Sequence, residues 1–394
     1  MGKAIARSAD MAADAQRLAD AAMARGDRGE ALQLLIALAD GHEVGPDVWI
    51  KLAALYRADG NLAAALSAIE AALALAPLDP TALLVRATLL DGLGRINEAG
   101  EAYDFALAQR QGDEIAAGPM AAALDRARLV RDNYRRGLEA TMAGAVATSE
   151  ANLVEAERRR LDRFISNTTR RTRAYPQVPT HFNYPGLPVD EFHDPALFPW
   201  LAEVEAATDS IAAELQVLLA GADLFEPYVD YAEGRPLAQW VDLHRSRRWS
   251  AIHLFKAGRA TEAAASCPRT MALLATLPQP VLLDRSPAAM FSALAPHTRI
   301  PPHTGVGNVR LVCHLPLIVP PGCVFRVGDE RREWVRGKAW VFDDTIEHEA
   351  WNDSDDDRII LIFDVWHPAL SAAERSAIAT VFGALDASYG DTGL

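Results

Sequence analysis

A spacing of 34 residues that recurs in the N-terminal part of the chain restricts this part to a repeat architecture. Three glycines keep this spacing, and three alanines keep it in a second register: Gly26, Gly60 and Gly94, and Ala31, Ala65 and Ala99. Apolar patterns of helical period run between the glycines, and Pro77 and Pro80 stand where a helix must stop. Because glycine permits a left-handed turn and close packing, each glycine marks the turn of a helical hairpin. The sequence therefore predicts a solenoid of helical hairpins.

Helical hairpins of this period resemble the tetratricopeptide repeat, with about three units over residues 10–112 and a poorly matched first unit. We assign residues 1–112 to these repeats. Such repeats stack into a superhelix whose concave face commonly binds peptides or proteins, so we expect a protein partner there. A packing or dimerisation module is the alternative. Alanine-rich helix continues beyond the repeats, and residues 113–175 are expected to form a helical extension or linker.

Composition and charge exclude several classes of partner. The formal net charge of −14 would repel nucleic acid and anionic lipid. No apolar run reaches the roughly 20 residues that a bilayer span needs, and the N-terminal segment does not resemble a secretory signal. Three cysteines without an even disulfide framework fit a reducing compartment. We therefore expect a cytoplasmic protein with no nucleic-acid partner and no membrane span.

The second half of the chain carries strand patterns. Prolines from Tyr175 onward end the helical region, and apolar and polar residues alternate from about residue 288 onward. Strands are expected at 309–315, 323–327, 333–335 after a Gly328-Asp329 turn, 339–342 and 358–366, and Ser371 with Glu374 predicts the N-terminal capping box of a last helix. The fold class is thus an α+β chain of several domains, in which the helical solenoid precedes a double-stranded β-helix (jelly-roll) domain with flanking helices at 176–394.

Two histidines and one arginine carry the candidate chemistry. His303 and His348 lie in the strand region, and Arg358 follows the second histidine by ten residues. Iron(II) oxygenases hold the metal with two histidines and usually a carboxylate. The usual place of that carboxylate, two residues after the first histidine, is Gly305 here, so the third ligand comes from elsewhere or is water. Arg358 on an apolar strand needs a partner, and 2-oxoglutarate would suit its planar fork; an internal salt bridge is the alternative.

Further candidates surround these three residues. His314 shares a strand face with Arg310, so both can point into one cavity, although a lone strand histidine is more often a satisfied core residue. Of the acidic residues around His348, Asp344 is the candidate that orients a metal ligand from the second shell.

Several motifs, in order, resemble the aspartyl/asparaginyl β-hydroxylase family. They are His303-Thr304-Gly305, Arg310-Leu311, His314-Leu315, Phe342-Asp343-Asp344, Glu347-His348-Glu349-Ala350-Trp351 and Asp364-Val365-Trp366-His367-Pro368. The resemblance implies iron held by His303 and His348 alone, with a glycine in place of the carboxylate. It further implies Arg358, His314 and Ser292 around 2-oxoglutarate.

The same resemblance makes Trp249 and Arg310 candidates for substrate contacts, and a core aromatic is the alternative for Trp249. In animal members of the family an arginine stands where this chain has Val312. This departure leaves the metal and co-substrate residues untouched, but it puts an Asp or Asn residue of an epidermal-growth-factor-like domain in doubt as the substrate.

These residues lead to a hypothesis of function. We expect a dioxygenase that uses Fe(II), 2-oxoglutarate and O2 to hydroxylate an unactivated C–H bond, by resemblance the β-carbon of an Asp- or Asn-like residue. We favour a peptide or protein substrate that the repeats recruit; a free amino acid and a lipid are further options. An inactive tetratricopeptide scaffold with a degenerate jelly roll is the alternative, and a cupin-like metalloenzyme would leave Arg358 unexplained.

Overall fold

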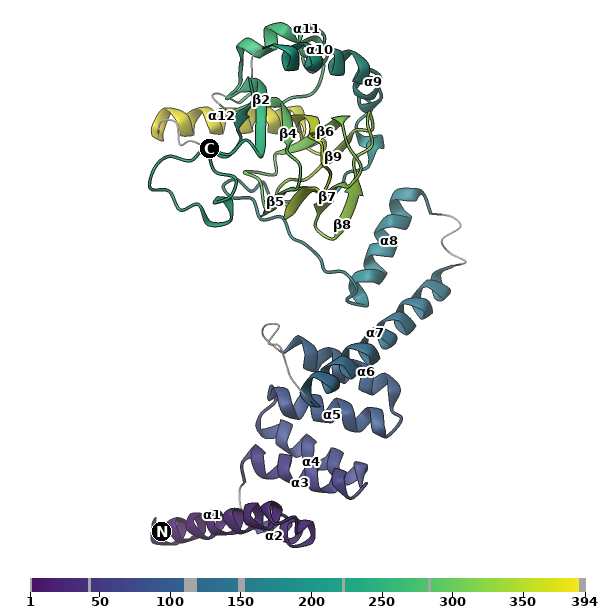
Figure 1. The fold of residues 1–394 in the computed structure, drawn as a ribbon, viewed down its shortest axis with the longest axis vertical. Coiled ribbons are helices and arrows are strands. Elements are labelled where there is room, and N and C mark those ends of the chain that lie inside the picture. The colour runs from purple at the N-terminus through teal and green to yellow at the C-terminus, as the bar shows by residue number, and fades with distance from the viewer. Residues whose placement is uncertain are drawn as a thin grey trace. The chain divides into compact units, whose positions relative to one another are not determined.

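The chain divides into two compact units, Met1–Thr172 and Arg173–Leu394 (Figure 1). The structure is a computed structural model that describes residues 2–41, 44–109, 119–147, 153–221, 224–282 and 285–389. The expected boundary between residues 112 and 113 lies outside the described residues. Across those described ranges, no helix combines the length and the apolar character that a membrane span requires.

The first unit begins with three helical hairpins, as the 34-residue spacing predicts. Their helices are α1 (Gly2–Ala24) and α2 (Arg28–Gly41), α3 (Pro46–Ala58) and α4 (Leu62–Leu75), and α5 (Pro80–Gly92) and α6 (Ile96–Ala108). Gly26, Gly60 and Gly94 sit at the three turns with φ of 80°, 76° and 72°. This left-handed conformation is the reason for glycine at each turn.

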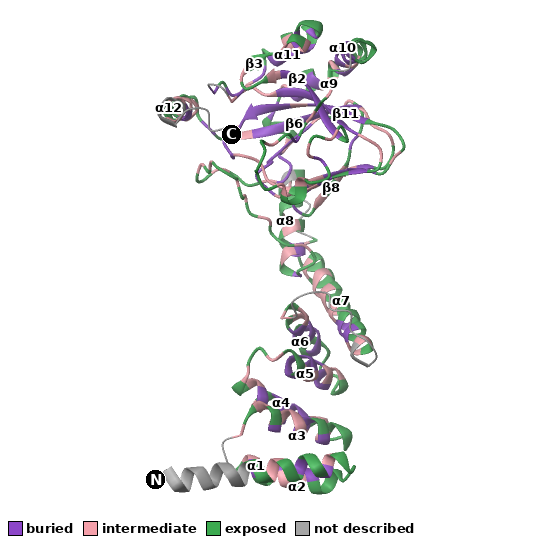
Figure 2. Ribbon diagram, turned by 60° about the vertical axis from the view of Figure 1, so that its left-hand side comes forward, coloured by how far each residue is buried: buried purple, intermediate pink, exposed green. Residues whose placement is uncertain are grey.

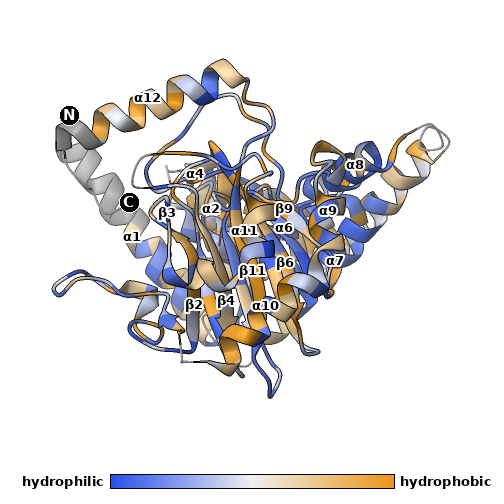
Figure 3. Ribbon diagram, turned by 90° about the horizontal axis from the view of Figure 1, so that it is seen from above, coloured by the Kyte–Doolittle hydropathy of each residue, from blue (hydrophilic) through white to orange (hydrophobic). Residues whose placement is uncertain are grey.

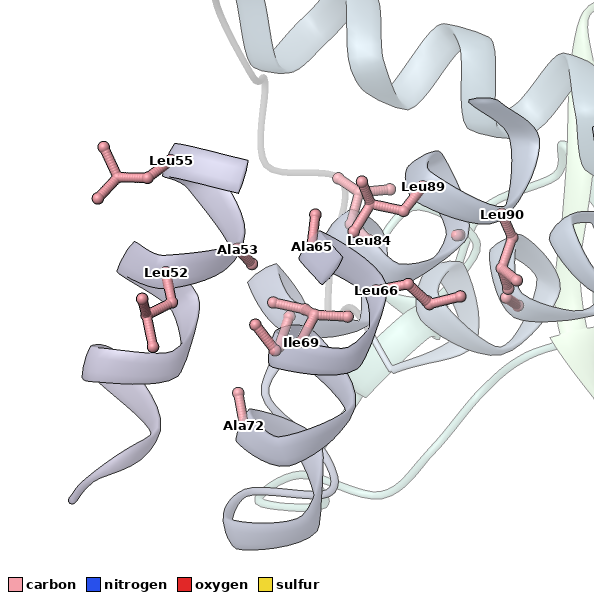
Figure 4. Packing of buried hydrophobic residues seen from close by; sticks show 14 of the residues in the cluster. Leu52, Ala53, Leu55, Ala65, Leu66, Ile69, Ala72, Leu84, Leu89 and Leu90 are labelled. Atoms are coloured by element: carbon pink, nitrogen blue, oxygen red, sulfur yellow. The ribbon is translucent and has the colours of Figure 1, made fainter. Parts of the chain in front are cut away.

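One apolar cluster joins the hairpins. The repeated alanines are fully buried where helices approach closely, and larger side chains such as Leu52, Ile69 and Leu90 fill the space between helices (Figure 4). The helices α7 (Pro119–Val146) and α8 (Glu155–Thr168) follow the repeats. The unit is therefore a solenoid whose core runs continuously from one hairpin to the next.

Close packing between α6 and α7 rests on Gly100. A Cβ at this position would overlap the first ring atoms of Tyr134, whereas a Cβ at Gly137 on α7 would meet nothing. We expect Gly100→Ala to destabilise the protein by about 1–3 kcal/mol through overpacking, although alanine is the better helix former. Gly137→Ala should stabilise it by roughly 0.5–1 kcal/mol.

Urea unfolding followed by circular dichroism measures both changes. A Gly100→Ala protein as stable as the Gly137→Ala control would contradict the close contact at Tyr134.

The second unit contains two sheets. The larger has the order β1-β2-β4-β11-β6-β9, with β3 paired to β2, and the smaller has the order β5-β10-β7-β8. The bounds in the larger sheet are β1 (Glu226–Pro227), β2 (Trp249–Lys256), β3 (Arg259–Ala260), β4 (Ala289–Leu294), β6 (Arg310–Ile318), β9 (Trp340–Phe342) and β11 (Arg358–Trp366). Those in the smaller sheet are β5 (Thr298–His303), β7 (Cys323–Val327), β8 (Glu330–Glu333) and β10 (His348–Asn352).

Alternation along the strands gives the larger sheet two different faces. On β11, Ile359, Leu361 and Phe363 pack in a cluster with α9 (Leu201–Ala206), α10 (Thr208–Ala220) and α11 (Pro268–Leu274), which cover this face (Figures 1 and 3). The opposite face packs against the smaller sheet, and Ile360 joins that second cluster. The central strands are buried on both sides (Figure 2). These helical repeats, followed by a two-sheet domain with flanking helices, confirm the expected α+β fold class.

The strand predictions differ from the structure most at β8. This strand spans Glu330–Glu333, because Glu330 pairs with Val327 directly after the Gly328-Asp329 turn. The expected strand at 333–335 is therefore wrong: Trp334 leaves the sheet and is buried. The last helix, α12 (Ala372–Tyr389), follows the expected capping box, in which Ser371 Oγ accepts from Glu374 N at 3.2 Å and Ser371 N donates to Glu374 Oε2 at 2.8 Å.

Candidate active site

His303 and His348 lie side by side on the smaller sheet. They end β5 and begin β10, they are cross-strand partners, and their ring centroids are 4.1 Å apart. Each Nδ1 lies beside a backbone carbonyl two residues earlier, at 2.8 Å from Pro301 O and 3.0 Å from Ile346 O. Because a carbonyl only accepts, each Nδ1 carries the hydrogen and each Nε2 keeps a free lone pair. Both rings are thus in the tautomer that binds a metal through Nε2.

The protonation state of the pair also favours metal binding. Burial, assisted by the neighbouring His348, lowers the pKa of His303 to about 3. Burial likewise lowers the pKa of His348 to about 4, and the charges of Arg310 and Arg326 act in the same direction. Both imidazoles are therefore neutral at neutral pH, which is the form that coordinates metal ions.

Gly305 makes room for the carboxylate of Asp344. A Cβ on Gly305 would overlap that carboxylate, and Gly305 N donates to Asp344 O at 2.6 Å. Asp344 Oδ2 accepts from Arg310 Nη2 at 3.0 Å, while Oδ1 is buried without a partner. Over the described part of the chain, no group of three or more His, Cys, Asp or Glu residues could hold a metal ion. The arrangement is a pair of histidines with a carboxylate beside it.

Arg358 adds a buried positive charge to the site. It begins β11, is 1% exposed, and its Nε and Nη2 have no hydrogen-bond partner. Burial lowers the pKa of Arg358 to about 10, so the guanidinium is still charged at neutral pH. The aromatic ring of Trp334 lies next to the guanidinium, with its centroid 4.8 Å from Arg358 Cζ. Among the ion pairs of the described residues none involves Arg358, so the internal salt bridge considered from the sequence is not found there.

His314 and Ser292 lie on strands next to β11. His314 is buried, its Nδ1 has no partner, and burial together with the charge of Arg358 holds its pKa well below the ordinary value. Ser292 Oγ accepts a hydrogen bond from Trp249 Nε1 at 3.3 Å. The alternative of a satisfied core histidine is therefore not met, since Nδ1 of His314 is buried without a hydrogen-bond partner.

All eight candidate residues border one cavity of about 1410 Å³: Trp249, Ser292, His303, Arg310, His314, Asp344, His348 and Arg358. The sheet register orders its floor. Ser292 lies across from Ile360, Met290 and His314 both lie across from Ile362, and Val312 lies across from Asp364. Met290 and Ile362 are thus level with His314, and Val312 is level with Asp364. These three apolar side chains, Met290, Val312 and Ile362, form an apolar band along the floor.

The sequence did not indicate the aromatic wall of this cavity. Tyr228 stacks on Trp249 with ring centroids 4.0 Å apart, and Trp240 lies 5.1 Å from the ring of His303. Both come from the segment 226–240, which has little regular structure and no periodic pattern. Trp249 itself is only 7% exposed, so it is at once a packed aromatic and a cavity residue.

Two family models match parts of this chain. Residues 205–368 match the family model "Aspartyl/Asparaginyl beta-hydroxylase", and residues 46–89 match a tetratricopeptide repeat model. The second unit thus contains a domain similar to the aspartyl/asparaginyl β-hydroxylases, here called the hydroxylase domain.

Three relatives of the hydroxylase domain differ in their identity to this chain and in the share of each protein that is matched. The human aspartyl/asparaginyl beta-hydroxylase is 37% identical over 155 residues, which cover 39% of this chain and 20% of that protein. The ornithine lipid ester-linked acyl 2-hydroxylase of Rhizobium tropici is 33% identical over 185 residues, which cover 46% of this chain and 62% of that protein. The mouse aspartate beta-hydroxylase domain-containing protein 2 is 39% identical over 119 residues, which cover 29% of this chain and 35% of that protein.

Part of this chain is also similar to solved structures. PcrH from Pseudomonas aeruginosa matches 32% of this chain and 92% of its own, at 19% identity and a TM-score of 0.26. A similarity this low carries no information on partners.

Gly305 leaves the space that the Asp344 carboxylate occupies. We expect Gly305→Ala to displace the Asp344 carboxylate and to weaken Co(II) binding by about 10- to 100-fold, as loss of an outer partner of a metal site does. Gly383→Ala on α12, where a Cβ meets nothing, is the control and should bind as the unmodified protein does. Titration with Co(II), followed by absorption, measures the affinity. Equal affinity in both variants would show that Gly305 has no such role.

Proposed function

We propose that the hydroxylase domain is an Fe(II)- and 2-oxoglutarate-dependent dioxygenase that hydroxylates an unactivated C–H bond. The observation that carries the proposal is the buried, unpartnered guanidinium of Arg358 in the same cavity as the paired His303 and His348. A buried cation needs an anion, and a metal-binding pair beside it fits an acidic co-substrate that also reaches the metal.

The residues fit iron. His303 and His348 would hold Fe(II) through Nε2, since imidazole suits this ion. Two protein ligands leave positions open for small molecules. When bound, Fe(II) and 2-oxoglutarate would activate O2: one oxygen atom would enter succinate as carbon dioxide is released, and the other would be inserted into the C–H bond.

The chain's own residues have distinct tasks in this proposal. Arg358 binds the distal carboxylate of 2-oxoglutarate with its free N–H groups, and His314 and Ser292 border the same end of the cavity. Met290, Val312 and Ile362 keep water from the reacting centre because they offer it no hydrogen bond. The unpartnered Asp344 Oδ1 accepts from a donor beside the histidines, and Arg310 fixes that carboxylate.

We further propose that the substrate is a residue of a peptide or protein, which the repeat unit binds. The cavity of about 1410 Å³ exceeds the roughly 300–1,000 Å³ of common small-molecule sites, so it has room for more than the co-substrate. A residue of Asp or Asn type is the expectation from the family. The apolar band that contains Val312 favours a second candidate, an acyl chain, in keeping with the name of the Rhizobium relative. An inactive scaffold would leave the complete set of His303, His348 and Arg358 without a use.

Succinate formation tests the proposal. The full chain, purified without oxygen and supplied with Fe(II) and 2-oxoglutarate, should form succinate when oxygen is admitted. His348→Ala should reduce the rate by at least about 100-fold, because one of two metal ligands is lost. His297→Ala is the matched control: His297 is an exposed histidine of the same unit, paired with Asp355 at 2.9 Å and away from the cavity.

Succinate is measured first without substrate, and then with peptides or acylated lipids to find which of them raises the rate. No succinate under any condition, or equal rates in the two variants, would refute the proposed enzyme or the ligand assignment respectively.

A further inference from the structure

Trp334 lies outside the motifs that point to the active site, yet it is held firmly beside it. It follows β8 and is 5% exposed. The turn after it is fixed at two points: Gly337 N donates to Pro316 O at 2.9 Å, and Ala339 N donates to Glu205 Oε1 at 3.0 Å. The position of the indole is therefore determined by the larger sheet and by α9.

The face of this indole covers Arg358. The guanidinium carbon lies 4.8 Å from the ring centroid, which is within the range of a cation–π contact. No ion pair among the described residues neutralises Arg358, so the electron-rich face of the ring contributes to compensating its charge. Such a contact contributes most when both partners are removed from water, and both are buried here.

Ordinary aromatic packing does not account for the surroundings of Trp334. Its ring is also close to Phe325 and Trp340, at 5.4 and 5.9 Å between centroids. Contacts of this kind are ordinary for any buried aromatic residue. The same cluster, however, contains five buried nitrogens without a partner: Arg358 Nε and Nη2, His314 Nδ1, Trp334 Nε1 and Trp340 Nε1. Buried polar atoms are nearly always paired. Three of the five nitrogens, Arg358 Nε and Nη2 and His314 Nδ1, belong to residues that border the cavity, so they point to a ligand rich in acceptors.

We infer that Trp334 is a positioning residue of the co-substrate site, whose indole face holds the Arg358 guanidinium in the orientation that receives the distal carboxylate of 2-oxoglutarate. The inference rests on the proposed function. Trp334 acts through Arg358, and it thereby sets the affinity for the dicarboxylate and leaves the later chemical steps alone.

Three variants of the full chain test this inference. Trp334→Leu removes the ring, Trp334→Phe keeps a ring over Arg358, and Trp351→Leu is the matched control. Trp351 is also a buried tryptophan under arginines, with Arg299 and Arg331 at 5.2 and 5.6 Å, but these two arginines are exposed and are not part of the cavity.

Binding is measured by calorimetry without oxygen, using 2-oxoglutarate as the probe in the presence of Fe(II), and succinate formation is measured beside it. Trp334→Leu should weaken 2-oxoglutarate binding by about 30-fold, which corresponds to ~2 kcal/mol. Trp334→Phe should recover most of the affinity, to within about fivefold of the unmodified protein, since phenylalanine offers a weaker cation–π face. The rate at saturating 2-oxoglutarate should stay within about threefold in both, and Trp351→Leu should bind normally.

The outcomes separate the two proposals. If the unmodified protein binds 2-oxoglutarate and Trp334→Leu binds it equally well, the role of Trp334 is refuted and the proposed function stands. If Trp334→Leu and Trp334→Phe lose affinity equally, the ring face is not the cause, and the inference is again refuted. If the unmodified protein binds no 2-oxoglutarate at all, both proposals fall. Should Trp334→Leu not fold, Trp334→Met, which fills the site without a ring, takes its place with the same expected loss.

Discussion

The second unit is organised around a buried positive charge that has no protein anion within the described residues. Arg358 begins β11, the strand between β4 and β6, and lies across from Leu294 on β4. The buried Asn352 fixes this corner: its Nδ2 donates to Leu294 O at 2.9 Å at the end of β4 and to Asp356 O at 2.8 Å just before β11. The backbone is thus locked on both sides of the guanidinium. An unpaired charge in such a rigid place destabilises the empty protein, and a bound anion removes that penalty.

The two sheets supply different residues of the site. The smaller sheet supplies His303 and His348, whose Nδ1 atoms are held by carbonyls of their own chain, so each ring is fixed by its local backbone. The larger sheet supplies Arg358, His314 and Ser292 from three adjacent strands. The residues proposed to bind the metal and those proposed to bind the anion thus come from different sheets and border one cavity. This arrangement would hold a co-substrate by its carboxylate at one end and bring the other end to the metal.

The sequence predicted those parts that depend on period and local chemistry. The glycine spacing gave three hairpins because each turn needs a left-handed residue, and the apolar run at 358–366 gave β11 with its correct bounds. It could not predict the groups that come together from irregular segments. Tyr228 and Trp240 stand in a stretch without periodicity, and Trp334 was expected in a strand because it follows alternating residues. Gly305 was recognised as a departure, but its reason, the space taken by the Asp344 carboxylate, requires the fold.

The most direct measurement compares stability and co-substrate binding in Arg358→Met. If Arg358 is kept as an unpaired buried cation in order to bind an anion, the substitution should raise the free energy of unfolding of the protein without ligand by about 1–3 kcal/mol. It should also abolish the stabilisation that 2-oxoglutarate gives the unmodified protein in thermal unfolding. A variant that is less stable and still stabilised by 2-oxoglutarate would contradict the account, because Arg358 would then be a structural residue and the anion would bind elsewhere.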